Sequence, residues 1–174
     1  MSWWLKIKNA VGVATAVELL LIVVLIFVIG IALLMMSVSM VAKANAADLA
    51  YGDSIALGTG NALRVQVSAR VGASSCSIAA RAPGGHYEHV VISAGINDPP
   101  GACLEAIRKA VSAGQVVWVL PAAINSARAH VLAVAQRWGD KTVSYSCAGG
   151  CSRSSFHPGS YAVLAAEVRR AWGS

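Results

Sequence analysis

The sequence predicts an α/β domain with a parallel sheet of about five strands covered by helices, preceded by one transmembrane helix. Three observations lead to this fold class. Short apolar runs rich in β-branched residues recur along residues 47–174, stretches with helical spacing separate them, and a long uncharged apolar run precedes them. Regular alternation of strand and helix is typical of a parallel sheet with helices packed on its faces. We therefore expect two parts, a membrane anchor or signal segment over 1–46 and one domain over 47–174.

The apolar run of the first part is expected to cross a membrane. Residues 19–41 contain no charged side chain and are nearly all aliphatic. About 20 such residues are enough to span a bilayer as a helix. Both interpretations of this segment place residues 47–174 on the extracytoplasmic side, in the periplasm or at the cell surface.

The two interpretations differ in whether the segment is retained. An uncleaved signal-anchor fits the length of the run, and the Trp3-Trp4 pair suits the membrane interface, with Lys6 and Lys8 on the cytoplasmic side. A cleavable signal fits the small residues Ala44-Asn45-Ala46, but signal cores are usually only about 7–15 residues long. The length favours the anchor, and secretion after cleavage near Ala46 is the alternative.

The strands of the domain are expected where β-branched residues cluster. The runs His89–Ser93 and Val116–Leu120 are continuous and apolar, as strands buried on both faces are. Weaker patterns predict the other three strands, over Asp48–Tyr51, Leu63–Ser68 and Thr142–Ser146.

Helices are expected between and after these strands. Cys103–Ala113 places apolar residues at helical spacing, and Gly114 is the expected stop. The stretches Ser126–Trp138 and Ser160–Trp172 have the same pattern, and each is followed directly by a glycine.

Charge and cysteine content narrow the class of protein. The net charge is +6, but the basic residues of the domain are scattered rather than clustered. A nucleic-acid surface usually has a basic stripe, so no nucleic-acid partner is expected.

The four cysteines form an even set beyond the apolar run, which suits disulfides in an oxidising compartment. Cys147 and Cys151 could form half of a zinc site, but no second ligand pair accompanies them. We therefore expect neither a metal nor a cofactor.

Polar residues and glycines that suit acyl transfer follow the predicted strands. In chain order they are Ser54, Gly72, Asn97 and His157. In open parallel sheets the ligand binds beyond the carboxyl ends of the strands. A serine becomes a nucleophile when a base takes its proton, and an imidazole is a suitable base near neutral pH. Backbone N–H groups and side-chain amides can stabilise the oxyanion that forms.

These residues resemble the motifs of the SGNH (GDSL-like) hydrolases. Gly52-Asp53-Ser54-Ile55 is similar to the nucleophile block of that family, and Gly95-Ile96-Asn97-Asp98 to its G-x-N-D block. Gly72 resembles its glycine block, and His157-Pro158 the end of its last block. The resemblance covers essentially all of residues 48–172 in order and spacing.

The resemblance implies a flavodoxin-like three-layer α/β/α domain and ester hydrolysis without a metal. It implies that Ser54 is the nucleophile and His157 the base. The oxyanion hole would consist of the Ser54 N–H, the Gly72 N–H and the Asn97 side chain. One position departs from the family, because Ser154 stands where an Asp usually orients the histidine. The Ser154 hydroxyl or a backbone carbonyl could orient His157 instead, in a Ser–His dyad.

The resemblance also places the cysteines. Cys76 follows the glycine block and Cys103 the G-x-N-D block, so a bridge between them would join two loops of the site. A Cys147–Cys151 bridge would close a tight loop before His157. Four cysteines allow three pairings, and the sequence does not choose among them.

Two functions are consistent with the sequence. The first is a membrane-anchored or exported serine esterase acting on a small acyl ester, such as an O-acetyl group of an envelope glycan or a lipid ester. The second is a catalytically silent binding or structural protein of the same fold at a membrane. The substrate and the oligomeric state cannot be predicted.

Overall fold

The computed structural model describes residues 21–32, 47–147, 150–151 and 156–173. The chain divides into two units, Met1–Ala44 and Asn45–Ser174. In the first unit, residues 21–32 form a helix with exposed side chains. No helix within the described ranges has both the length and the apolar character needed to span a bilayer. The remainder of the predicted 19–41 segment, its Trp and Lys flanks and the Ala46 site lie outside the described residues.

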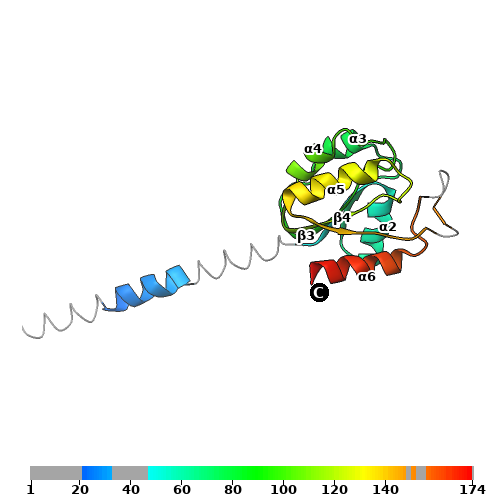
Figure 1. The fold of residues 1–174 in the computed structure, drawn as a ribbon. Helices are drawn as coiled ribbons and strands as arrows, with labels where there is room; N and C mark the ends of the chain where they lie inside the picture. Colours follow the sequence, from blue (N-terminus) through cyan, green and yellow to red (C-terminus); the bar gives the residue numbers. More distant parts are fainter. Residues whose placement is uncertain (1–20, 33–46, 148–149, 152–155, 174) are drawn as a thin grey trace, which may run out of the picture. The chain divides into compact units, whose positions relative to one another are not determined.

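The second unit is an α/β domain with a five-stranded, all-parallel sheet, as predicted (Figure 1). The spatial order of the strands is β2-β1-β3-β4-β5, which is the order of flavodoxin-like sheets. The strands are β1 (Leu49–Gly52), β2 (Gln66–Ala69), β3 (His86–Ser93), β4 (Ser112–Val119) and β5 (Lys141–Val143). The helices of this unit are α2 (Ser54–Leu63), α3 (Ser75–Ala79), α4 (Leu104–Lys109), α5 (Ala127–Trp138) and α6 (Tyr161–Trp172).

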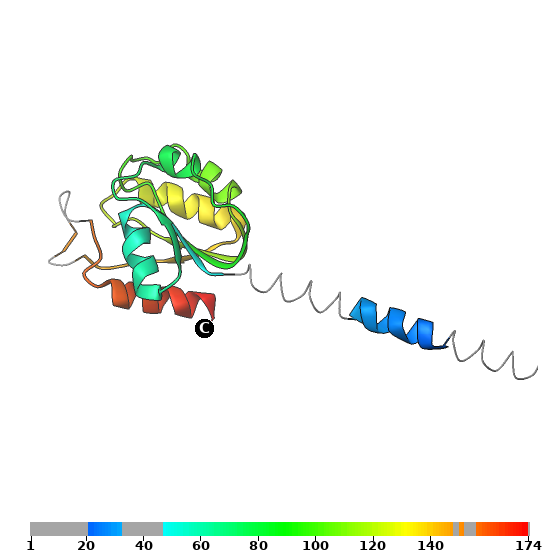
Figure 2. The same cartoon turned by 180° about the vertical axis from the view of Figure 1, so that it is seen from behind.

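Helices cover both faces of the sheet. Figures 1 and 2 show α3, α4 and α5 on one face and α2 and α6 on the other. Neighbouring residues of a strand point to opposite faces. In β4, Trp118 therefore belongs to the core under α3–α5, whereas Val117 and Val119 belong to the core under α2 and α6. The central strands are apolar on both sides because both sides are covered.

Two predicted boundaries were wrong in the middle of the chain. The helix predicted over 103–113 ends at Lys109, and residues 112–113 already belong to β4. Gly114 is therefore a strand residue and not a helix stop. A Cβ atom at Gly114 would lie 3.1 Å from the Glu88 carbonyl oxygen of β3, so close strand packing accounts for this glycine.

The edge strands also differ from their predicted ranges. Leu63, predicted as the start of a strand, is the last residue of α2, and β2 begins at Gln66. The last strand ends at Val143, and Ser144–Ser146 leave the sheet. Helices α2 and α3 were not predicted, because their stretches are rich in small residues that are weak helix formers.

Candidate functional site

Ser54 is the first residue of α2, and only Asp53 separates it from the end of strand β1. Asp53 caps the helix, and its Oδ1 accepts hydrogen bonds from the backbone N–H groups of Ile55 (2.9 Å) and Ala56 (3.4 Å). A helix start leaves its first N–H groups without helical partners. Among the described residues, the Ser54 N–H has no acceptor. It is therefore free to donate to a negatively charged oxygen.

Gly52 lets β1 approach β3 closely at this point. Gly52 has φ +141°, and a Cβ atom there would lie 1.9 Å from the Ser93 carbonyl oxygen. The same carbonyl accepts a hydrogen bond from the Asp53 N–H at 3.0 Å. This contact fixes the turn that carries Ser54 against the end of β3.

The loops after β1, β2 and β3 are joined to one another by hydrogen bonds. The Arg70 N–H donates to the Gly52 carbonyl at 3.0 Å. The Asn97 side-chain amide donates to the Ala73 carbonyl at 3.0 Å. An amide nitrogen has two hydrogens, so one remains for a ligand. The loops of Ser54, Gly72 and Asn97 thus lie together at the carboxyl edge of the sheet.

Gly72 lies in the turn after β2 with φ +70°, a conformation that favours glycine. Nothing lies within 4 Å of the place where its Cβ would be. Its N–H, like that of Ser54, has no backbone acceptor among the described residues.

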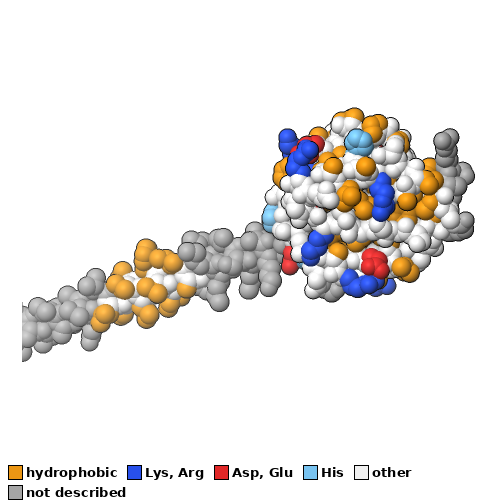
Figure 3. Space-filling view, viewed as in Figure 1, with side chains coloured by type: hydrophobic (Ala, Val, Ile, Leu, Met, Phe, Trp, Pro, Cys, Tyr) orange, Lys and Arg blue, Asp and Glu red, His pale blue; other side chains and the backbone are white. Residues whose placement is uncertain are grey.

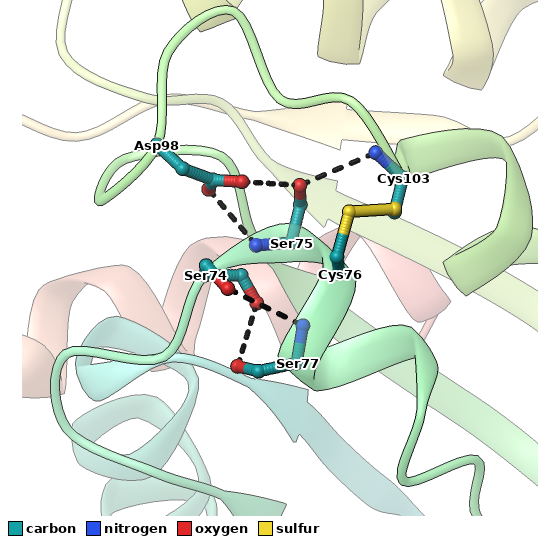
Figure 4. Close-up of a disulfide and its surroundings, with 6 residues drawn as sticks. All are labelled: Ser74, Ser75, Cys76, Ser77, Asp98 and Cys103. Carbon is teal, nitrogen blue, oxygen red and sulfur yellow. Dashed lines mark hydrogen bonds between the residues drawn. A yellow bond between two sulfur atoms is a disulfide. The ribbon is translucent and has the colours of Figure 1, made fainter.

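Asp98 and a disulfide join the loop of Gly72 to the loop of Asn97 (Figure 4). The Asp98 carboxylate accepts hydrogen bonds from the Ser75 N–H (2.9 Å) and hydroxyl (2.5 Å). Cys76 and Cys103 form the disulfide. Asp98 therefore acts as a structural hydrogen-bond acceptor. The Cys76–Cys103 bridge between the two loops, one of the pairings considered from the sequence, is present. Cys147 and Cys151 form the second disulfide.

Removing the Cys76–Cys103 bridge should destabilise the protein and loosen the site. The bridge spans 27 residues, and loop-closure entropy gives such a bridge about 3.5 kcal/mol. The Cys76→Ser/Cys103→Ser double variant should lose about this much free energy of unfolding in urea titrations. The Cys147→Ser/Cys151→Ser variant is the control, because a bridge across 4 residues is worth only about 2 kcal/mol by the same relation. Equal losses in both variants would contradict this account.

His157 is held on a segment that is fixed on both sides. The Tyr145 hydroxyl donates to the Phe156 carbonyl at 2.6 Å, and the Gly159 N–H donates to the Ser146 carbonyl at 2.8 Å. Pro158 pairs with Cys147 in an isolated antiparallel bridge. The His157 side chain is exposed, so its ring can reach a substrate.

The Nδ1 atom of His157 lies 2.9 Å from the Tyr161 hydroxyl. Neither Tyr161 nor Tyr145 was predicted from the sequence, because neither belongs to a motif. Ser154, the predicted orienting residue, lies outside the described residues. No hydrogen bond joins Ser54 to His157 among the described residues, and such bonds are often long before a substrate binds.

His157 nevertheless lies toward the end of α2 that carries Ser54. The Tyr161 ring lies against Gly58, one helical turn after Ser54 and on the same face of α2. The charge of His157 also acts on the carboxyl group of Asp53, the neighbour of Ser54.

Asp53 is a carboxyl group fully buried beside the serine. Burial raises its pKa above the ordinary value of 3.8, and the Ser93 side chain, the backbone N–H groups of Ile55 and Ala56 and the charge of His157 oppose the rise. The negative charge of Asp53 in turn helps to raise the pKa of Tyr145 and Tyr161, although burial is the larger cause for both.

Replacing Asp53 by Asn should make the protein more stable at neutral pH. Because the folded pKa of Asp53 is raised, the folded state binds a proton that the unfolded state has released, so the free energy of unfolding falls as the pH rises above 3.8 through the higher folded value. Asn keeps the capping acceptor and removes this fall. In urea unfolding at pH 4, 6 and 8, the free energy of unfolding of Asp53→Asn should increase relative to that of the parent as the pH rises. The exposed Glu88→Gln substitution is the control, and a variant that loses stability toward pH 8 would contradict the prediction.

A cavity of about 450 Å³ lies between the segment after β5 and helix α6. Its lining includes Tyr145, Cys147, Ser160, Val163 and Glu167. Neither Ser54 nor His157 lines it. Within the part of the chain that the structure describes, no group of three His, Cys, Asp or Glu side chains could hold a metal ion.

On the face that Figure 3 shows, the Lys and Arg side chains lie in separate spots. Comparison of the chain with protein-family models, with curated proteins and with solved structures found no match.

Proposed function

We propose that this protein is an extracytoplasmic serine esterase of the SGNH (GDSL-like) type. The observation that carries the proposal is the joining of three loops at one sheet edge. The bonds from Arg70 N–H to Gly52, from Asp53 N–H to Ser93 and from the Asn97 amide to Ala73 are each 3.0 Å long. They hold together the loops of a serine, a glycine N–H and an asparagine amide, in the order that the resemblance implies.

In the proposed reaction, Ser54 attacks the acyl carbon of an ester. The Ser54 Oγ forms the new bond as its proton passes to Nε2 of His157. The carbonyl oxygen becomes an oxyanion that accepts from the Ser54 N–H, the Gly72 N–H and the Asn97 amide. The C–O bond of the ester then breaks, and the alcohol leaves with the proton from Nε2. Water hydrolyses the acyl-serine by the reverse proton transfers.

The proposed substrate is a small acyl ester at the cell envelope, such as an O-acetylated glycan or a lipid ester. Two disulfides support an oxidising compartment. The uncharged run over residues 19–41 supports a membrane anchor, with secretion after cleavage near Ala46 as the alternative.

A silent binding or structural protein at a membrane is the second candidate. Ser154 stands where the resembled family has an acid, and this position favours a protein that kept the fold without the chemistry.

Ester turnover distinguishes the two candidates. The oxidised full chain, in mild detergent with a chelator present, should hydrolyse a short-chain nitrophenyl ester at pH 8. The His157→Gln variant should lose about 10²–10⁴-fold in kcat, the usual contribution of a general base. A parent protein no faster than buffer would overturn the esterase and leave the binding protein as the account of this fold.

A further inference from the structure

We propose that Tyr161 is the residue that positions His157 as the base, in the role that the resembled family gives to an aspartate. This inference rests on the proposed esterase function. The Tyr161 hydroxyl lies 2.9 Å from His157 Nδ1. Tyr161 follows His157 by four residues and is the first residue of α6, so a helix fixes its backbone.

Gly58 leaves room for the Tyr161 ring. A Cβ atom at Gly58 would lie 2.3 Å from the Cε1 atom of Tyr161 and 2.4 Å from its Cζ atom. The ring can therefore occupy this position only because residue 58 has no side chain. Gly58 is one turn from Ser54 on α2, and positions four apart share a helix face. The contact of the Tyr161 ring with Gly58 thus holds the tyrosine hydroxyl, and the imidazole bonded to it, on the side of α2 that carries Ser54.

A phenol hydroxyl can orient an imidazole without taking its proton. A hydroxyl both donates and accepts, so the Tyr161 oxygen can accept from Nδ1–H and leave Nε2 free for the Ser54 proton. Burial and the charge of Asp53 raise the pKa of Tyr161, so the hydroxyl stays neutral at the pH of the reaction. When Ser54 attacks, its proton moves to Nε2, and the Nδ1–H group remains hydrogen-bonded to the Tyr161 oxygen. No proton leaves the tyrosine.

The test combines kinetics with the tautomer of His157 in the full chain. Tyr161→Phe removes the hydroxyl and keeps the ring on Gly58. Gly58→Ala keeps the hydroxyl and displaces the ring, which is partly exposed and has room to move outward. Tyr87→Phe is the matched control, because its hydroxyl bonds to the Gly84 carbonyl at the amino end of β3. The ¹⁵N spectrum of histidine-labelled protein reports which ring nitrogen carries the proton, and the His157→Gln spectrum identifies the His157 signals.

The parent protein should hold the neutral His157 proton on Nδ1. Both Tyr161→Phe and Gly58→Ala should move it toward Nε2 and lower kcat about 10- to 100-fold, as when a histidine loses its outer hydrogen-bond partner. KM should not change, and Tyr87→Phe should match the parent. If the parent is active and either Tyr161→Phe or Gly58→Ala has the same His157 tautomer and the same kcat as the parent, the positioning role of Tyr161 is overturned and the esterase function stands. A parent without esterase activity overturns the proposed function, and the positioning role with it, whatever the tautomer.

Discussion

Replacing Ser54 by alanine is expected to abolish ester hydrolysis while leaving the fold intact. The hydroxyl has no hydrogen-bond partner among the described residues, so its loss removes no hydrogen bond within them. Alanine also suits the first turn of a helix that Asp53 already caps. Removing the nucleophile of a serine hydrolase typically lowers kcat by a factor on the order of 10⁴–10⁶. Steady-state hydrolysis of a nitrophenyl ester at pH 8 measures this loss.

A second serine provides the control for this experiment. The Ser112 hydroxyl bonds to His86 at 2.9 Å, at the amino end of β4 and so at the opposite edge of the sheet. Ser112→Ala removes the same atom from a Ser–His pair and should keep full activity. Residual turnover in Ser54→Ala equal to that of Ser112→Ala would show that the hydrolysis does not use Ser54.

Replacing Gly52 by alanine should strongly destabilise the domain. The new Cβ would lie 1.9 Å from the Ser93 oxygen and 2.9 Å from the Ser93 carbonyl carbon. Both are backbone atoms of the central sheet, so neither can rotate away. The φ of +141° adds strain for any residue with a Cβ. Overpacking and backbone strain together suggest a loss of about 3–5 kcal/mol in urea unfolding.

The consequence extends from stability to the site. Separating β1 from β3 would break the hydrogen bond between the Asp53 N–H and the Ser93 carbonyl, which fixes the turn before Ser54. Any Gly52→Ala protein that still folds should therefore also hydrolyse the ester slowly. Gly84→Ala is the control, because nothing lies within 4 Å of its added Cβ and its φ is ordinary. A change below about 0.5 kcal/mol, as for a typical surface substitution, is expected there. A Gly52→Ala protein as stable as Gly84→Ala would contradict the packing described for β1 and β3.

The sheet could be predicted from the sequence because its strands are continuous apolar runs. Val90–Ile92 and Val116–Val119 are buried on both faces, as is typical of the strands of a parallel sheet covered by helices. The order of the polar turn residues was also predictable, since a parallel sheet brings every strand's carboxyl end to the same edge.

Helix α2 could not be predicted from local preference. Its glycines at 58 and 60 oppose a helix by about 1 kcal/mol each. Tertiary contacts account for both, because a Cβ at Gly60 would lie 2.6 Å from side-chain atoms of Ala50 and Val67, and Gly58 makes room for Tyr161. Close packing of the helix on β1 and β2 thus overrides its weak propensity.

The partner of His157 was missed for a similar reason. The resemblance implies an acid three residues before the histidine. The structure places a tyrosine hydroxyl four residues after it. The pairing of Gly58 with Tyr161 links positions far apart in the chain, and no single motif contains both.

Covalent labelling of Ser54 tests the central claim most directly. The oxidised full chain and its Ser54→Ala variant would be treated at pH 8 with a fluorophosphonate probe, and the modified peptide identified by mass spectrometry. We expect one label, on Ser54, that is absent from the variant and much slower to form in His157→Gln. A parent chain that stays unlabelled, or that carries the label at another residue, would contradict an activated nucleophile at the start of α2.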